Sequence, residues 1–180
     1  VKPAWVFHML RSMLGDDVFF PALKAYFNEF AFTSIETEDM VKFFEKQVPN
    51  PPVPFRTFFD QWVYQAGHPV YELNAASRTN GGGFIATADL RQTQAGNNIP
   101  EVFVMPVKIT FKNSAGEEAT HTIINDRRQQ TAEFALSFAP DSVFLDRDDE
   151  ILNKKSVFVT ATAVRDEPGV VREDSYSMFP

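Results

Sequence analysis

The stretch Phe58-Phe59-Asp60-Gln61-Trp62-Val63-Tyr64-Gln65-Ala66-Gly67-His68-Pro69-Val70-Tyr71 separates two kinds of hydrophobic pattern. Before it the apolar residues recur at helical spacing, and after it they alternate as they do in strands. Its own apolar residues place Phe58, Phe59, Trp62 and Val63 on one buried face of a last helix. Gly67 and Pro69 then end that helix. The sequence therefore predicts a two-part α+β protein whose parts meet at about residues 66–70.

The residues before this junction predict short antiparallel helices, in a bundle or an α-solenoid segment. The expected helices cover 4–14, 17–31, a segment entered at 33–40 that continues to 48, and a last one from 55. Ser34 or Thr37 is the expected N-cap of the third helix. The second helix carries more phenylalanine than one apolar stripe needs. These phenylalanines belong either to a bundle core or to a surface that packs on protein outside this chain, and both interpretations stay open.

The residues after the junction predict six or seven short strands without intervening helices. The candidates are 70–73, 83–94, 102–112, 119–125, 132–138, 142–145 and 157–164. Such a pattern is typical of an immunoglobulin-like antiparallel β-sandwich. Pro106 is expected at an edge or a bulge. We therefore expect a helical domain at 1–68 and a β-sandwich domain at 69–180, with a polar, loosely ordered tail from Asp166.

Composition limits the function classes. The chain has 180 residues, a net charge of −7 and no cysteine. A nucleic-acid partner would require a basic surface, which neither half of the sequence offers. Disulfides and thiolate metal sites are excluded, and no apolar run is long enough to span a membrane. The opening at Val1 without methionine is what an excised piece of a longer protein would show, so the compartment stays open.

The residue types that carry chemistry are scattered along the sequence. His8, His68 and His121 are not at metal-ligand spacing, and no H-E-x-x-H motif occurs, so each histidine is expected to be structural. The acidic run Asp146-Arg147-Asp148-Asp149-Glu150 could hold Ca²⁺, although it lacks the EF-hand pattern. A solvated turn between strands is the favoured interpretation of that run.

The remaining candidates give no active site. Gly81-Gly82-Gly83 lacks the lysine and helix of a phosphate loop and is expected to be a hairpin connection. No serine lies in a G-x-S-x-G context, and the serines considered are Ser12, Ser34 and Ser77. The acidic residues expected on helices are solvated by default, namely Asp39, Glu45 and Asp60. The sequence thus assigns no catalytic, cofactor-binding or metal-binding residue.

Four segments in a fixed order resemble a known family. They are Lys2-Pro3-Ala4-Trp5-Val6-Phe7-His8-Met9-Leu10-Arg11, Leu14-Gly15-Asp16, Thr37-Glu38-Asp39-Met40, and the stretch from Phe58 to Pro69. Together they are similar to the M1 zinc aminopeptidases, the gluzincin family of aminopeptidase N. The resemblance covers residues 1–73 and continues more weakly through 90–94 and 143–152.

The resemblance implies a thermolysin-like catalytic domain that ends in helices and is followed by a small β-sandwich. It implies removal of N-terminal amino acids from peptides, with zinc held by two histidines and a glutamate, a glutamate as general base and a tyrosine that stabilises the oxyanion. The family tyrosine belongs to a Tyr-x-Lys-Gly segment. If Lys2 is that lysine, the tyrosine stands one position before Val1, and Pro3 departs from the family glycine.

Two functions of different classes follow. The first is a non-catalytic C-terminal fragment of a zinc aminopeptidase, which supports the zinc cleft and has the missing catalytic domain as its partner. In that case the zinc and the peptide substrate belong to the parent enzyme. The alternative is a freestanding protein- or glycan-binding module with an Ig-like domain. A parent whose zinc site has decayed is a third possibility. Substrate preference and oligomeric state stay open.

Overall fold

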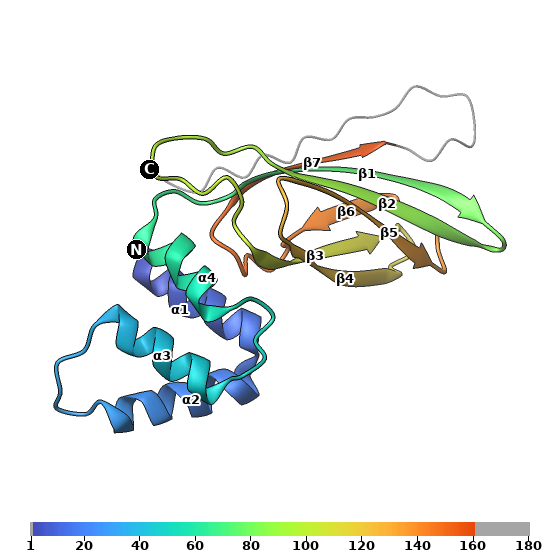
Figure 1. Cartoon of the computed structure of the whole chain (residues 1–180). Coiled ribbons are helices and arrows are strands. Elements are labelled where there is room, and N and C mark those ends of the chain that lie inside the picture. The colour runs from blue at the N-terminus through green and yellow to red at the C-terminus, as the bar shows by residue number, and fades with distance from the viewer. Residues whose placement is uncertain (1, 161–180) are drawn as a thin grey trace.

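The computed structural model of the chain describes residues 2–160, and the side chains up to 159 (Figure 1). The helices are α1 (Lys2–Leu14), α2 (Asp16–Glu29), α3 (Thr37–Gln47) and α4 (Phe55–Phe59). A π-helix, η1 (Asp60–Tyr64), continues α4 without a break. We call residues 2–68 the helical part and residues 69–160 the β part. The expected tail from Asp166 and the end of the strand expected at 157–164 lie outside the described residues.

The helices begin and end where local chemistry favours it. Gly15 has a φ of 76°, a left-handed conformation that suits glycine and lets α1 turn directly into α2. α3 is capped by Glu36, whose main-chain N–H donates to Asp39 Oδ2 at 2.9 Å while its own side chain accepts from the main chain of Asp39. The expectation of Ser34 or Thr37 as N-cap is therefore wrong, because a carboxylate pair forms the capping box instead.

The β part contains seven strands in two sheets. They are β1 (Val70–Asn80), β2 (Gly83–Gln92), β3 (Met105–Lys112), β4 (Glu118–Asn125), β5 (Gln129–Leu136), β6 (Ser142–Leu145) and β7 (Lys154–Thr160). One sheet has the order β5-β2-β1-β7 and the other has the order β4-β3-β6. All pairs are antiparallel except β1 with β7, which is parallel. The expectation of a purely antiparallel arrangement is corrected at this pair.

Two local features of the strands can be compared with the sequence-based expectations, namely the length of β1 and the position of Pro106. β1 runs on to Asn80, beyond the expected end at 73, because Gly81 and Gly82 at positive φ form a two-residue turn that keeps β1 and β2 paired up to Asn80 and Gly83. Pro106 lies in the half of β3 that pairs with β4 alone, since β6 begins to pair only at Ile109. A proline is tolerated there, as the sequence predicts.

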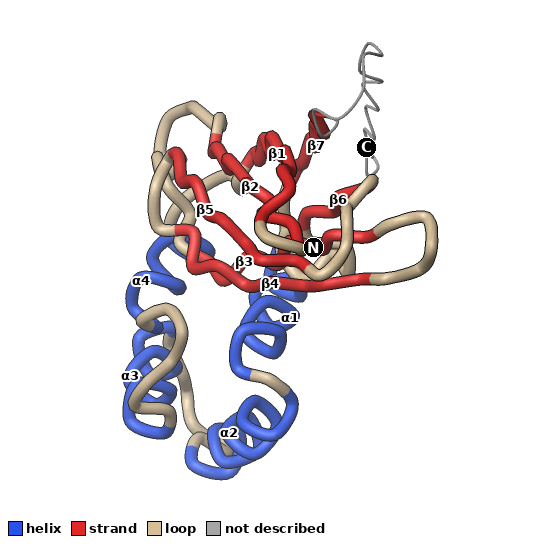
Figure 2. Tube along the Cα trace, turned by 90° about the vertical axis from the view of Figure 1, so that its right-hand side faces the viewer, coloured by secondary structure: helices blue, strands red, loops and turns tan. Residues whose placement is uncertain are grey.

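The helical part lies against one side of the β part. In Figure 2, α1 and α4 are the helices nearest to the sheets, and α2 and α3 lie farther away. The apolar core is continuous from the helices into the space between the sheets. Its largest fully buried side chains are Trp62, Tyr26, Tyr71, Phe44, Phe55, Phe58, Phe59, Phe103 and Phe111, with Met9, Leu10 and Leu73. Aromatic burial of this extent is the main favourable contribution to folding.

A buried amide network holds the segment that meets the helices. Gln92 Oε1 accepts from the main-chain N–H of Phe103 at 2.8 Å, and its Nε2 donates to the carbonyl of Phe103 at 2.9 Å. The same Nε2 lies 2.6 Å from Asn125 Oδ1, and Gln94 Nε2 donates to Gln92 Oε1 at 3.0 Å. Because buried amides are costly unless paired, this network places Phe103 in one position at the boundary between the two parts.

Candidate functional site

The helical part contains a pocket of about 380 Å³. It lies between the first two turns of α1, the segment that enters α3, and the end of the last helix. The lining residues are mainly apolar: Pro3, Val6, Phe7, Ile35, Met40, Phe59, Trp62 and Val63, with Lys2, Tyr26, Glu36 and Thr37. This volume falls within the usual range for ligand pockets in proteins. The pocket is therefore a candidate binding site in the helical part.

The two charged residues of the pocket are already engaged. Lys2 Nζ donates to the carbonyl of Gln65 at 2.9 Å and so joins the start of α1 to the end of η1. Burial lowers the pKa of Lys2. Glu36 forms the capping box of α3 with Asp39. An occupant would therefore meet an apolar interior bounded by one cation and one anion, each held by main-chain partners.

Two buried polar atoms, on residues that also line the pocket, lack hydrogen-bond partners among the described residues. Tyr26 and Trp62 are 1% and 0% exposed, and neither Tyr26 Oη nor Trp62 Nε1 has a hydrogen-bond partner. Burial, and secondarily the charge of Asp39, raise the pKa of Tyr26. Buried hydroxyl and indole groups are normally hydrogen-bonded, since leaving one unpaired costs on the order of 1–3 kcal/mol. These two atoms are therefore unsatisfied polar groups of the apolar core next to the pocket.

The last helix corrects one expectation. Phe58, Phe59 and Trp62 are buried as predicted, but Val63 is 41% exposed. Val63 lines the pocket, and the described residues cover it only in part. In its place the polar Gln61 is buried, at 4% exposure. The buried face of this helix is thus shifted toward Gln61.

Gln61 joins the helices to the sheets. Its Nε2 donates to the carbonyl of Val104 at 2.7 Å, and its Oε1 accepts from the main-chain N–H of Val104 at 2.8 Å. Next to it, Trp62 packs on Phe103 with ring centroids 4.7 Å apart. One residue of η1 therefore satisfies both main-chain groups of a strand-like segment, as a neighbouring strand would. This contact fixes how the helical part sits on the β part.

We expect Gln61→Leu to destabilise the protein by about 2–4 kcal/mol, because it leaves the N–H and the carbonyl of Val104 unpaired. Gln61→Glu keeps the shape but presents carboxylate oxygens to the carbonyl of Val104, so it should also be destabilising. Urea denaturation gives both values. The matched control is Gln65→Leu, which changes a side chain that makes no described hydrogen bond. Equal effects of Gln61→Leu and Gln65→Leu would contradict the importance of this contact.

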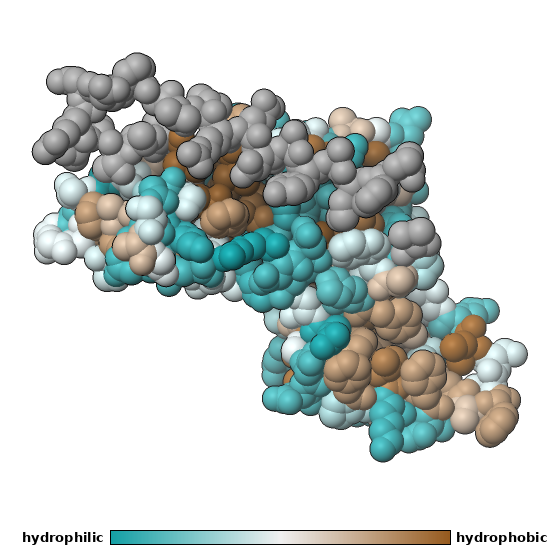
Figure 3. Space-filling view, turned by 180° about the vertical axis from the view of Figure 1, so that it is seen from behind, coloured by the Kyte–Doolittle hydropathy of each residue, from teal (hydrophilic) through white to brown (hydrophobic). Residues whose placement is uncertain are grey.

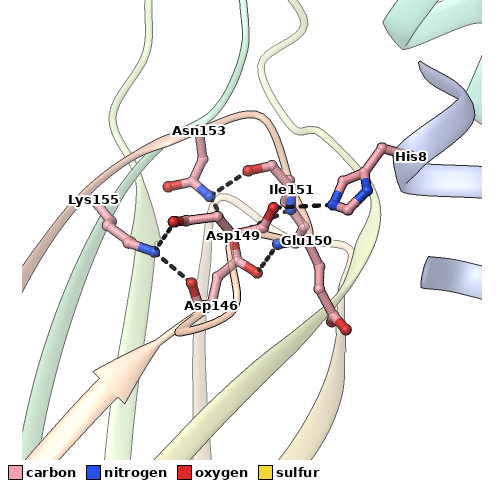
Figure 4. A network of polar contacts seen from close by, with 7 residues as sticks. All are labelled: His8, Asp146, Asp149, Glu150, Ile151, Asn153 and Lys155. Carbon is pink, nitrogen blue, oxygen red and sulfur yellow. Dashed lines mark hydrogen bonds and ion pairs between the residues drawn. The ribbon is translucent and has the colours of Figure 1, made fainter. Parts of the chain in front are cut away.

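The acidic run after β6 is built around a buried carboxylate (Figure 4). Asp146 is 1% exposed, and its oxygens accept from the N–H groups of Glu150 and Ile151, at 2.9 and 3.2 Å, and from Asn153 Nδ2 at 2.7 Å. Burial raises the pKa of Asp146, although Lys155 and these hydrogen bonds oppose the change. The expectation of a solvated turn is therefore wrong for Asp146, because its carboxylate organises the turn from within.

A lysine stands where a bound cation was considered. Lys155 Nζ donates to the carbonyl of Asp146 and lies 2.8 Å from Asp149 Oδ1. The same loop contacts the helical part, because His8 Nε2 of α1 lies 3.2 Å from the carbonyl oxygen of Asp149 (Figure 4). This run thus serves as a second contact between the two parts, and Lys155 provides a positive charge beside Asp149.

The structure keeps the other candidates apart. His68 Nδ1 lies near the carbonyl of Pro69, at 3.1 Å, and His121 stacks on Phe134 with its buried Nε2 lacking a partner. The three serines lie in separate elements, with Ser12 on α1, Ser34 before α3 and Ser77 on β1.

The acidic residues that were expected to be solvated on helices have different environments. Asp60 is exposed, and Glu45 lies 3.6 Å from Arg56. Asp39 instead forms the capping box with Glu36, so for this residue the expectation of a solvated charge is corrected.

The zinc that the resemblance implies does not fit the residues present. Between residues 2 and 160, no three His, Cys, Asp or Glu side chains gather in a way that could hold a metal ion. Within the same range, no helix has the length and apolar character needed to cross a membrane.

Gln61 and Tyr26 were not singled out from the sequence, and Asp146 was named only as part of the acidic run, not as a buried carboxylate. Gln61 and Asp146 are polar, and polar residues are expected at the surface unless a partner is known. Tyr26 falls among several aromatic residues of one helix, so nothing singled it out. The sequence does contain a signal that Asp146 could be buried. Asn153 and Lys155 follow it closely, and an amide and an ammonium group can pair with a buried carboxylate.

Comparisons with known proteins find similarity to aminopeptidases. A family model described as "Peptidase family M1 domain" matches residues 1–66. Aminopeptidase Q of Felis catus is 35% identical over 81 residues, which cover 42% of this chain and 8% of that protein. Aminopeptidase N of Mus musculus is 28% identical over 143 residues, covering 76% of this chain and 14% of that protein.

A segment of a solved structure has a similar fold. That structure is the crystal structure of Legionella pneumophila aminopeptidase A in complex with aspartic acid, with a TM-score of 0.64, 20% sequence identity, and coverage of 85% of this chain and 17% of that chain. The chain thus spans about a tenth of the length of the curated relatives it matches first, and 17% of the solved one.

Proposed function

Because this chain is related to the M1-family aminopeptidases, we propose that it is a non-catalytic segment of such an enzyme and supports its zinc-binding catalytic domain. In this proposal residues 1–68 are the helical C-terminal end of the catalytic domain. Residues 69–180 would be the enzyme's Ig-like domain, which would act as a spacer or support. The whole enzyme would remove N-terminal amino acids from peptides.

The observation that carries the proposal is the exposed apolar surface of the helical part. Large apolar side chains that are at least 40% exposed lie on α2, in the loop that follows it and on η1: Val18, Phe20, Phe27, Phe32, Ile35, Val63 and Tyr64. Figure 3 shows apolar side chains gathered on the rear face of this part. Clusters of this kind mark surfaces that contact another protein surface. They lie within residues 1–66, the segment that matches the M1 domain.

Zinc would then be held by residues outside this chain. When bound, it would supply Lewis-acid activation of the peptide carbonyl and of a water molecule. The residues described here would contribute position and rigidity, through the Gln61 contact with Val104 and the Lys2 contact with Gln65. No observation on residues 2–160 favours the alternative of a freestanding binding module.

The test uses the complete reading frame that contains this chain. We expect the upstream reading frame to encode an H-E-x-x-H motif with a further glutamate ligand. The upstream polypeptide alone should hydrolyse amino-acid arylamides poorly, and addition of this chain in trans should restore at least ten-fold more activity. The chain alone should release no arylamine and should retain no zinc after dialysis.

Two results would contradict the proposal. One is a dialysed sample of the chain alone that holds one equivalent of zinc or cleaves the arylamide. The other is an upstream polypeptide that neither binds this chain nor gains activity from it. A version of the chain with Phe27→Asp, on the exposed face of α2, tests whether the apolar surface is responsible.

A further inference from the structure

We propose that the turn between β1 and β2 is a site of spontaneous covalent modification, in which Asn80 loses its side-chain amide and becomes aspartate or isoaspartate. Of the asparagines in the chain, Asn80 alone is followed by glycine. A glycine leaves the next main-chain nitrogen unshielded by any side chain, which is the main requirement of this reaction. The reaction consumes water and needs no enzyme. The inference goes beyond the proposed function and does not depend on it.

The reaction proceeds in two steps. The main-chain nitrogen of Gly81 attacks Cγ of Asn80, and the new bond closes a cyclic imide. The bond from Cγ to Nδ2 breaks, and ammonia leaves with the proton of the Gly81 N–H. Water then opens the imide, at Cγ to give aspartate or at the main-chain carbonyl carbon of Asn80 to give isoaspartate. Either product adds one negative charge to a chain whose net charge is −7.

The structure leaves both reacting groups accessible to each other and to water. Asn80, Gly81 and Gly82 are exposed. A Cβ added at Gly81 or Gly82 would meet no atom within 4 Å, so nothing crowds the turn. Among the described residues, neither the side-chain amide of Asn80 nor the main-chain N–H of Gly81 has a hydrogen-bond partner. The amide carbon and the attacking nitrogen are therefore not held by competing contacts.

The location of Asn80 at the end of a two-stranded ribbon allows the rotation that the attack requires. Up to residue 160, β7 pairs with β1 as far as Ala76, and β5 pairs with β2 only from Phe84 onward. The last pair, Asn80 with Gly83, thus depends on β1 and β2 alone. An extended main chain keeps Cγ of Asn80 away from the next nitrogen, so this pair must open first. Two-stranded ribbons are marginally stable, so opening at the end requires little free energy.

The modification would leave the rest of the fold in place. Figure 1 shows this turn at the end of the β part that lies farthest from the helices. Isoaspartate lengthens the main chain by one methylene group, which would disturb the pair of Asn80 with Gly83. The pairs from Thr79 with Phe84 onward lie before the altered bond and would keep their register. The contacts between the helical part and the β part are therefore expected to persist.

A second hairpin turn supplies a matched comparison within the same chain. Asn113 lies between β3 and β4 and is followed by the small residue Ser114. Its Nδ2 donates to Glu117 Oε2 at 2.8 Å, and its Oδ1 accepts from the main-chain N–H of Glu117 at 2.9 Å. The nitrogen that would attack, that of Ser114, donates to Asp141 Oδ2 at 2.6 Å. Because both reacting groups are held, we expect Asn113 to remain intact where Asn80 reacts.

The experiment incubates the chain at mildly alkaline pH and follows peptides by mass spectrometry. Trypsin cleaves after Arg78 and Arg91 and releases a peptide in which Asn80 is the single asparagine. We expect this peptide to show the mass increase of amide replaced by carboxylate, with isoaspartate detected by a methyltransferase specific for it. Asn80 should react at least about ten-fold faster than Asn113, a difference in barrier of about 1.4 kcal/mol.

A pair of substitutions in the turn tests the role of Gly81. Gly81→Ala places a methyl group beside the attacking nitrogen, whereas Gly82→Ala adds the same group one position later, also at positive φ and in open space. We expect Gly81→Ala to slow the reaction of Asn80 about ten-fold and Gly82→Ala not to slow it. Equal slowing by both variants, or equal rates at Asn80 and Asn113, would overturn the inference. So would an Asn80 that stays intact in the chain while a synthetic peptide of residues 76–84 reacts.

Discussion

Replacing Phe103 by alanine is expected to lower the free energy of unfolding by about 3–5 kcal/mol and to let the helical part unfold before the sheets. Phe103 is fully buried, and its ring packs on Trp62 at 4.7 Å between centroids. Its main chain is held by Gln92. The substitution therefore removes an aromatic contact across the boundary but leaves the main-chain hydrogen bonds of residue 103 in place.

The matched control for this substitution is Phe111→Ala. Phe111 is equally buried but lies within the sheets, where its ring contacts Phe134 at 5.6 Å. Both variants should lose similar stability, and only Phe103→Ala should separate two transitions. Both tryptophans lie in the helical part, so indole fluorescence reports on it and far-ultraviolet circular dichroism reports on both parts. Coincident fluorescence and dichroism curves for Phe103→Ala would show that Phe103 does not couple the two parts.

Asp146→Ala is the second substitution with a large expected effect, a loss of about 3–5 kcal/mol. It leaves the N–H groups of Glu150 and Ile151 and the amide of Asn153 without an acceptor in a largely buried turn. Asp146 also has a φ of 45°, a conformation that aspartate tolerates better than alanine. Thermal or urea denaturation gives the value. Asp148→Ala, an exposed position in the same turn, should change stability by less than about 0.5 kcal/mol.

The titration of Asp146 makes the stability of the protein depend on pH. Burial raises the pKa of Asp146 above its ordinary value of 3.8, so the folded protein keeps this proton to higher pH than the unfolded chain does. The contribution of Asp146 to stability is therefore greatest below pH 3.8 and decreases as pH rises through the folded pKa. Asp146→Asn cannot titrate and should lack this decrease. A difference between the two proteins that is constant from pH 3.5 to 7 would contradict the raised pKa.

Local patterns predicted more of the fold than of the site. The junction near residues 66–70, the four helices and all seven strands follow from apolar periodicity and from turn residues such as Gly15 and Gly67, which act over a few positions. The parallel pairing of β1 with β7 depends on residues far apart in the sequence, so no local pattern contains it. The pocket likewise forms only when three separate segments of the helical part come together.

Local sequence patterns also did not predict the polar contacts between the two parts. Gln61 was not assigned to the buried face of the last helix, but the main chain of Val104 supplies both of its partners from 43 positions away. The buried position of Asp146 depends on Asn153 and Lys155, which approach it only after the turn has closed. Burial of a polar residue is decided by such partners, and a single sequence does not show which partners meet.

The parallel pairing of β1 with β7 also bears on how the molecule folds. The four-stranded sheet joins the first strand of the β part to the last, so its edge cannot be completed until nearly the whole β part has been synthesised. Contacts between such distant positions carry a large loop-closure entropy and are typical of slow folding. On a ribosome the helices would be complete long before this sheet closes, and their apolar surface would stay open to chaperones or to a neighbouring domain during that interval.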